Sequence, residues 1–355
     1  MNKSQIFILG CERSGSTWLS NILDAHPDIE FFMEPFADYV DLFPGFPNRN
    51  IYFDSGNAGN DEIINMVNNG YKSLTYWKYL FFYKPGGNTD FKKFDHLISN
   101  TYSAILRKLQ LKLPLWLLKY QLLNLNTLYL PPNIKPKDKN YILTIEVTKE
   151  LRLNFKINLL ARIFPNAQYI VVIRHPGAQI SSIKKLFHRK HLGELNRYLC
   201  SFIDDILECS IFKEYWNTAQ LIQTDNNLDK KLALWWLINY NVLLSNLKFN
   251  QLNYHLIKHE ELSYDPTQTI YSLFKKINLS YHKNVESYLE ESSNKSSLTS
   301  SPVNTTRDSK TYYIQCIKDI DPKLNQIIEE IIANQNHITP LDADLSNYLR
   351  QFYTF

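Results

Sequence analysis

The sequence predicts an α/β fold with a central parallel sheet, helices on its faces and an inserted helical cap. A short apolar run at 6–9 leads through a glycine-containing loop into helical spacing of apolar residues at 16–25. From residue 141 onward, apolar runs alternate with helical patterns, as they do in parallel βαβ units. Residues 38–138 instead combine proline and glycine loop signals with aromatic helical patterns, which indicates an insertion.

The loop from Gly10 to Thr17 has the strand–loop–helix setting of a phosphate-binding loop. Such a loop aims backbone N–H groups and the positive end of a helix dipole at an anion. Ser16 stands where loops that bind nucleoside triphosphates carry a lysine, and Arg13 places a cation within the loop instead. We therefore predict a three-layer fold like that of the P-loop NTPases, with a phosphorylated nucleotide other than ATP or GTP. An ordinary strand–turn–helix is the alternative.

A second polar motif follows the most strand-like run of the chain, residues 169–173. This run is β-branched and uninterrupted, so we expect a buried, central strand. Arg174 comes at its carboxyl end, where the ligands of parallel sheets gather, and Ser182 follows eight residues later. The arginine offers a fork for phosphate, and the serine and the helix start add donors. The alternative is a structural arginine that pairs with an acidic neighbour.

These motifs resemble those of sulfotransferases that use 3′-phosphoadenosine 5′-phosphosulfate (PAPS). The residues at 13–19, 24–28 and 34–35 (Arg-Ser-Gly-Ser-Thr-Trp-Leu, Asp-Ala-His-Pro-Asp and Glu-Pro) are similar to the start of that family, most closely to its carbohydrate and tyrosylprotein branches. Arg174, Pro176 and Ser182 resemble the family's second nucleotide-binding segment. Weaker likeness in later segments extends the resemblance over roughly residues 5–335.

The resemblance implies in-line transfer of a sulfuryl group from PAPS to an acceptor hydroxyl, with no metal required. Glu34 would be the general base, with a solvated surface glutamate as the alternative. Arg13 would stabilise the leaving phosphate, and Lys149, expected at the end of a strand, would assist at the sulfuryl group. The residues expected to bind the nucleotide are Arg13, Ser14, Gly15, Ser16, Thr17, Trp18, Arg174, Ser182 and Arg307. The acceptor stays open among glycan, tyrosyl peptide, lipid and small metabolite.

Composition and sequence patterns limit the expected partners and cellular location of the protein. The net charge is only +4 and no dense basic run accompanies it, which argues against nucleic acid as a partner. Four cysteines without zinc spacing and the absence of a leader pattern before the first strand lead us to expect a reducing, cytoplasmic setting. No apolar run reaches about 18 residues, so no membrane span is expected. The apolar stretch at 115–129 fits a buried helix, a lid or a peripheral membrane contact.

We expect a single domain over 1–355, with its core at about 1–37 and 139–335 and the cap at about 38–138. Residues 292–309 are rich in serine and threonine and read as a loop or lid. His259, Glu260 and Glu261 suggest a metal site, but hydrogen bonding within the fold is the favoured interpretation. Two other functions stay open: a nucleotide-dependent phosphotransferase and a non-catalytic nucleotide-binding protein.

Overall fold

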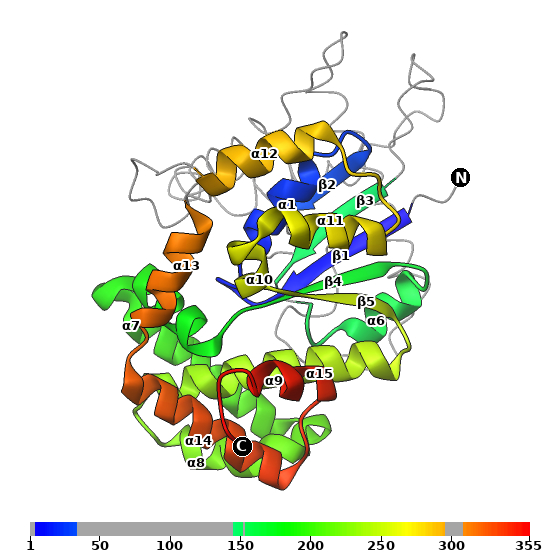
Figure 1. Ribbon diagram of the computed structural model, residues 1–355. Helices are drawn as coiled ribbons and strands as arrows, with labels where there is room; N and C mark the ends of the chain where they lie inside the picture. Colours follow the sequence, from blue (N-terminus) through cyan, green and yellow to red (C-terminus); the bar gives the residue numbers. More distant parts are fainter. Residues whose placement is uncertain (1–3, 34–144, 152, 295–307) are drawn as a thin grey trace, which may run out of the picture. The chain divides into compact units, whose positions relative to one another are not determined.

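In the computed structural model, β1 (Ser4–Gly10) is the middle strand of a five-stranded sheet with the order β2-β3-β1-β4-β5 (Figure 1). The other strands are β2 (Ile29–Met33), β3 (Ile145–Glu150), β4 (Gln168–Ile173) and β5 (Asn253–Lys258). Every neighbouring pair is parallel. The carboxyl ends of all strands therefore meet at one edge of the sheet, where ligands of such folds bind.

The structure describes residues 4–33, 145–151, 153–294 and 308–355. All of them belong to the same one of the two units into which the chain divides. The predicted cap at 38–138 lies outside the described residues, as do Glu34 and Arg307. The predicted domain boundaries stay predictions.

The described helices follow the strands in chain order. They are α1 (Ser16–Asp24), α6 (Ile157–Ile163), α7 (Pro176–Glu208), the 3₁₀ helix η2 (Ser210–Tyr215), α8 (Trp216–Gln223), α9 (Leu228–Phe249), α10 (His259–Tyr264), α11 (Pro266–Lys276), α12 (Lys283–Asn294), α13 (Ser309–Lys318), α14 (Pro322–Ile338) and α15 (Ala343–Leu349). None of these helices has both the length and the apolar character that crossing a membrane requires.

Apolar side chains on both faces bury the inner strands. Ile8 of β1 belongs to a core cluster with Leu19 of α1, Leu273 of α11 and Leu289 of α12. On the opposite face, the ring of Phe7 contacts that of Phe164, just after α6, with centroids 5.0 Å apart. Helices therefore cover both faces of the sheet, as Figure 1 shows, and the predicted α/β fold is confirmed.

The run at 169–173 forms the buried strand β4, which lies inside the sheet between β1 and β5 as expected, although β1 takes the middle position. Helix α6 begins only at Ile157, because the residues directly before it form a turn. Cys209 has an extended backbone that separates α7 from η2 and α8.

Candidate functional site

The loop after β1 has a backbone that glycine makes possible. Gly15 has φ 97° and precedes α1, and Arg13 also has a positive φ of 66°. A side chain at Gly15 would begin 2.2 Å from Cδ2 of His259, so the ring of His259 packs directly on the loop. Glycine is thus required at this position for two reasons, its backbone conformation and the close approach of His259.

Three buried or half-buried side chains hold the carbonyl groups of this loop. Asn154 donates to the Gly10 carbonyl at 3.0 Å, and Gln179 donates to the Glu12 carbonyl at 2.8 Å. Arg174 donates to the Arg13 carbonyl at 3.1 Å. Because carbonyl groups are thereby engaged with the protein, the loop can present N–H groups to an anion.

Helix α9 supports two of these donors from behind. Gln179 accepts hydrogen bonds from Trp236 at 3.0 Å and from Tyr240 at 3.4 Å. Asn154 also donates to Asn239 at 3.2 Å. Helix α9, which also packs Trp235 and Trp236 into the interior, therefore supports the loop after β1. Sequence patterns give no signal for Asn154, because an isolated asparagine in a turn is ordinary.

Hydrogen-bond donors lie where the loop leads into α1. Ser16 and Thr17 open α1, so their N–H groups have no acceptor within the helix. The Ser14 hydroxyl is buried and, within the described part of the chain, has no hydrogen-bond partner. An unpaired buried hydroxyl is costly, which fits a loop built around a polar ligand.

The two sequence motifs meet in the structure. Arg13 donates from Nε to the Ser182 hydroxyl at 3.0 Å, although the two residues are 169 positions apart in the chain. Arg174 is 6% exposed and reaches the carbonyl of the same Arg13. The parallel sheet explains this meeting, because β1 and β4 are neighbours whose carboxyl ends lie side by side.

The other predicted site residues differ in their placement. Lys149 does not follow β3 but lies within it, 2% exposed and paired in register with Ile8 and Met33. Trp18 is 7% exposed, belongs to the core cluster, and donates to Ser292 of α12 at 3.1 Å. Ser292 therefore lies in a helix rather than in the expected loop.

The turn that precedes β2 is fixed by His26. Its Nδ1 accepts from the Asp28 N–H at 3.1 Å, and its Nε2 donates to the Ser280 carbonyl at 2.9 Å. Burial lowers the pKa of His26, which favours the neutral ring that these two bonds require. β2 then ends at Met33, directly before Glu34.

β5 ends at Lys258 and α10 begins at His259, and the polar residues at this junction bond within the fold as predicted. His259 Nδ1 lies 3.2 Å from the Ser263 hydroxyl, and Glu260 accepts from the His175 N–H at 2.8 Å. Lys258 donates to Glu261 at 2.8 Å. Among the described residues, no group of His, Cys, Asp or Glu side chains is arranged to hold a metal ion.

Comparison with known proteins gives one family for this chain. The model of the "Sulfotransferase family" matches residues 5–283. It does not distinguish the carbohydrate and tyrosylprotein branches, so that assignment stays a prediction. No curated protein sequence matches the chain.

Three solved structures are similar to this chain at low identity. The sulfotransferase domain from the curacin biosynthetic pathway has 17% identity, a TM-score of 0.39 and coverage of 100% of this chain and 99% of that one. Mouse sulfotransferase SULT7A1 complexed with PAP has 11% identity, a TM-score of 0.42 and coverage of 99% and 90%. Sulfotransferase STF9 from Mycobacterium avium has 12% identity, a TM-score of 0.37 and coverage of 99% and 77%.

Proposed function

Because the chain belongs to the sulfotransferase family, we propose that it transfers a sulfuryl group from PAPS to an acceptor hydroxyl by in-line displacement. PAPS carries a 5′-phosphosulfate and a 3′-phosphate, so its recognition requires anion-binding groups in two places. Glycans, tyrosyl peptides, lipids and small metabolites all carry a suitable hydroxyl.

The contact between Arg13 and Ser182 carries this proposal. It joins the loop after β1 to the segment after β4 at 3.0 Å, and Arg174 binds the same loop at 3.1 Å. The loop after β1 thus carries one arginine and is bound by a second, and phosphate groups match the charge and the fork geometry of arginine.

The buried Ser14 hydroxyl and the open N–H groups at the start of α1 fit the 5′-phosphate. We assign Ser14, Gly15, Ser16 and Thr17 to it, and Arg174 and Ser182 to the 3′-phosphate. Trp18, adjoining the loop, and Arg307 complete the proposed nucleotide site.

Three residues are assigned to the reaction itself. Glu34 takes the proton of the acceptor hydroxyl; in the sequence it directly follows Met33, the last residue of β2. Arg13 stabilises the negative charge that develops on the leaving phosphate, and Lys149 of β3 assists at the sulfuryl group. Cations and backbone amides supply the charge stabilisation, so no metal takes part in the proposed reaction.

Nucleotide binding without Mg²⁺ tests the proposal. We expect 3′,5′-ADP to bind more tightly than 5′-AMP or ATP in isothermal titration calorimetry. Arg174→Ala should weaken the binding of 3′,5′-ADP by about 1.5–3 kcal/mol, the usual contribution of a hydrogen bond to a charged group. Arg197→Ala is the matched control, since it also removes an arginine, but an exposed one within α7, the helix that follows Arg174.

Equal affinity for 3′,5′-ADP and 5′-AMP would remove the 3′-phosphate assignment. Tighter, Mg²⁺-dependent binding of ATP would instead favour a phosphotransferase. Labelled-PAPS transfer to representative glycans, tyrosyl peptides, lipids and phenols then identifies the acceptor class, and binding without any transfer would indicate a non-catalytic protein.

A further inference from the structure

The backbone directly after Arg174 is held by a buried carboxylate. Glu260 of α10 accepts the His175 N–H through Oε1 at 2.8 Å, and only 8% of Glu260 is exposed. Burial raises the pKa of Glu260, against the lowering effects of its hydrogen bonds and of the Arg174 charge. The Glu260 carboxylate thus binds the N–H group of the peptide that directly follows Arg174.

The second oxygen of this carboxylate is engaged by the C-terminal segment. Tyr348 of α15, which is 1% exposed, donates its hydroxyl proton to Glu260 Oε2 at 3.0 Å. Glu260 thus has one oxygen on the backbone of His175 and the other on Tyr348. Each oxygen thus has a donor other than Arg174, which itself donates to the Arg13 carbonyl.

Two further rings of the same segment pack on His175. The centroid of Phe352 lies 4.5 Å from that of the imidazole, and the centroid of Tyr353 lies 5.6 Å from it. His175 Nδ1 meanwhile accepts from the Gly177 N–H at 3.1 Å, which caps α7. The peptide that joins Arg174 to α7 is therefore fixed by the C-terminal segment as well as by its own cap.

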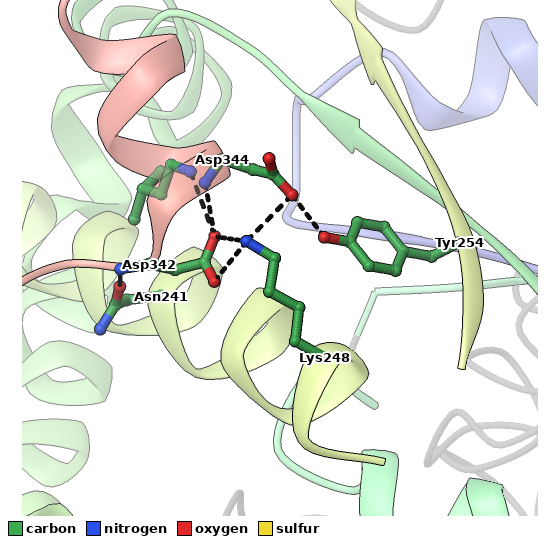
Figure 2. Close-up of polar contacts among 6 residues, drawn as sticks. Asn241, Lys248, Tyr254, Asp342 and Asp344 are labelled. Carbon is green, nitrogen blue, oxygen red and sulfur yellow. Dashed lines mark hydrogen bonds and ion pairs between the residues drawn. The ribbon is translucent and has the colours of Figure 1, made fainter. Parts of the chain in front are cut away.

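Ion pairs and hydrogen bonds at the start of α15 hold the helix that carries Tyr348. Figure 2 shows Lys248 of α9 between two carboxylates, at 2.8 Å from Asp342 and 3.1 Å from Asp344. Tyr254 of β5 donates to Asp344, and the Asp342 N–H donates to Asn241 at 2.7 Å. These contacts tie α15 to the sheet and to α9. The segment lies beyond residues 5–283, the part matched by the family.

We propose that Tyr348 is a positioning residue for recognition of the 3′-phosphate, acting through Glu260 on Arg174. This inference rests on the proposed function. Its physical basis is competition for one cation. Removal of the Tyr348 hydroxyl takes the hydrogen-bond donor away from Oε2 of the buried Glu260 carboxylate. Because an unsatisfied buried oxygen is costly, a hydrogen bond from another donor becomes favourable. Arg174 is the neighbouring cation, and a pair with Glu260 would occupy donors that a phosphate requires.

The test compares two nucleotides that differ only in the 3′-phosphate. For Tyr348→Phe we expect the preference for 3′,5′-ADP over 5′-AMP, measured as the ratio of dissociation constants, to fall about two- to tenfold. Affinity for 5′-AMP should stay within about twofold of wild type, because this ligand makes no use of Arg174. General loss of structure would weaken both nucleotides alike.

Thr218→Val is the matched control. It also removes a buried hydroxyl, one that donates to Gln335 at 2.8 Å between α8 and α14, and it should leave the ratio unchanged. The double variant Tyr348→Phe/Glu260→Gln tests the route, because a neutral amide does not compete for Arg174. We expect it to recover most of the lost preference. Thermal unfolding of each variant accompanies the titrations and shows whether Tyr348→Phe folds.

The outcomes separate the two proposals. An unchanged ratio in Tyr348→Phe, or an equal loss for both nucleotides, overturns the role of Tyr348 and leaves the proposed function intact. Failure of the double variant to recover overturns the route through Glu260. A wild-type protein without preference for 3′,5′-ADP overturns the proposed function, and this inference with it.

Discussion

Replacement of Gly15 by alanine tests the geometry of the phosphate loop most directly. The new Cβ would meet His259 Cδ2 at 2.2 Å, well inside van der Waals contact, and the residue has φ 97°. His259 is 8% exposed and its Nδ1 lies 3.2 Å from Ser263, so its ring cannot simply swing into solvent.

The magnitude follows from two contributions. A left-handed backbone at a residue with a side chain costs about 1–2 kcal/mol. Overpacking against a buried ring costs a further amount of about 1–3 kcal/mol. We therefore expect Gly15→Ala to lower the free energy of unfolding by about 2–5 kcal/mol in urea titrations, with weaker binding of 3′,5′-ADP.

A double-mutant cycle with His259→Ala separates the two contributions, because it removes the clash and leaves the backbone strain. The coupling energy should be about 1–3 kcal/mol in favour of the double variant. Gly193→Ala is the control: outside its own turn of α7, no atom of the described residues lies within 4 Å of the added Cβ, so alanine should be neutral or stabilising. Additive effects of Gly15→Ala and His259→Ala would refute the packing of His259 on Gly15.

Two further predictions concern the base and the buried histidine. Glu34→Gln should lower the rate of sulfuryl transfer by about 10²–10⁴-fold with little change in 3′,5′-ADP affinity, and normal turnover would exclude Glu34 as the base. Burial, with the nearby Arg174 charge, lowers the pKa of His175 to about 4. The unfolded chain therefore takes up a proton near pH 6.5 that His175 of the folded protein does not bind at that pH. The contribution of His175 to the free energy of unfolding is fully present above pH 6.5 and should decrease by about 3 kcal/mol on acidification to pH 4. His175→Asn keeps an acceptor for the Gly177 N–H and should flatten this part of the unfolding profile; an unchanged slope would assign it to another group.

The sequence alone determined the fold class and the two polar motifs. Local patterns are sufficient for this, because a buried parallel strand reads as a continuous apolar run and a phosphate loop needs its glycines at fixed spacing. The chain order of Arg13, Arg174 and Ser182, together with the carboxyl-end rule, placed them at one edge of the sheet. The family resemblance came from the same residues.

Only the tertiary structure decided what holds that site together. Asn154 and Gln179 bind the loop carbonyls, His259 packs on Gly15, and Tyr348 reaches Glu260 from the far end of the chain. Lys149 lies at the end of β3, as its sequence position suggested, but its burial was not apparent from the sequence. These facts have no local signature, because a polar side chain has the same appearance in the sequence whether it faces water or a buried carbonyl. A buried polar group must be hydrogen-bonded, and the tertiary fold decides which donor or acceptor lies near enough to be its partner.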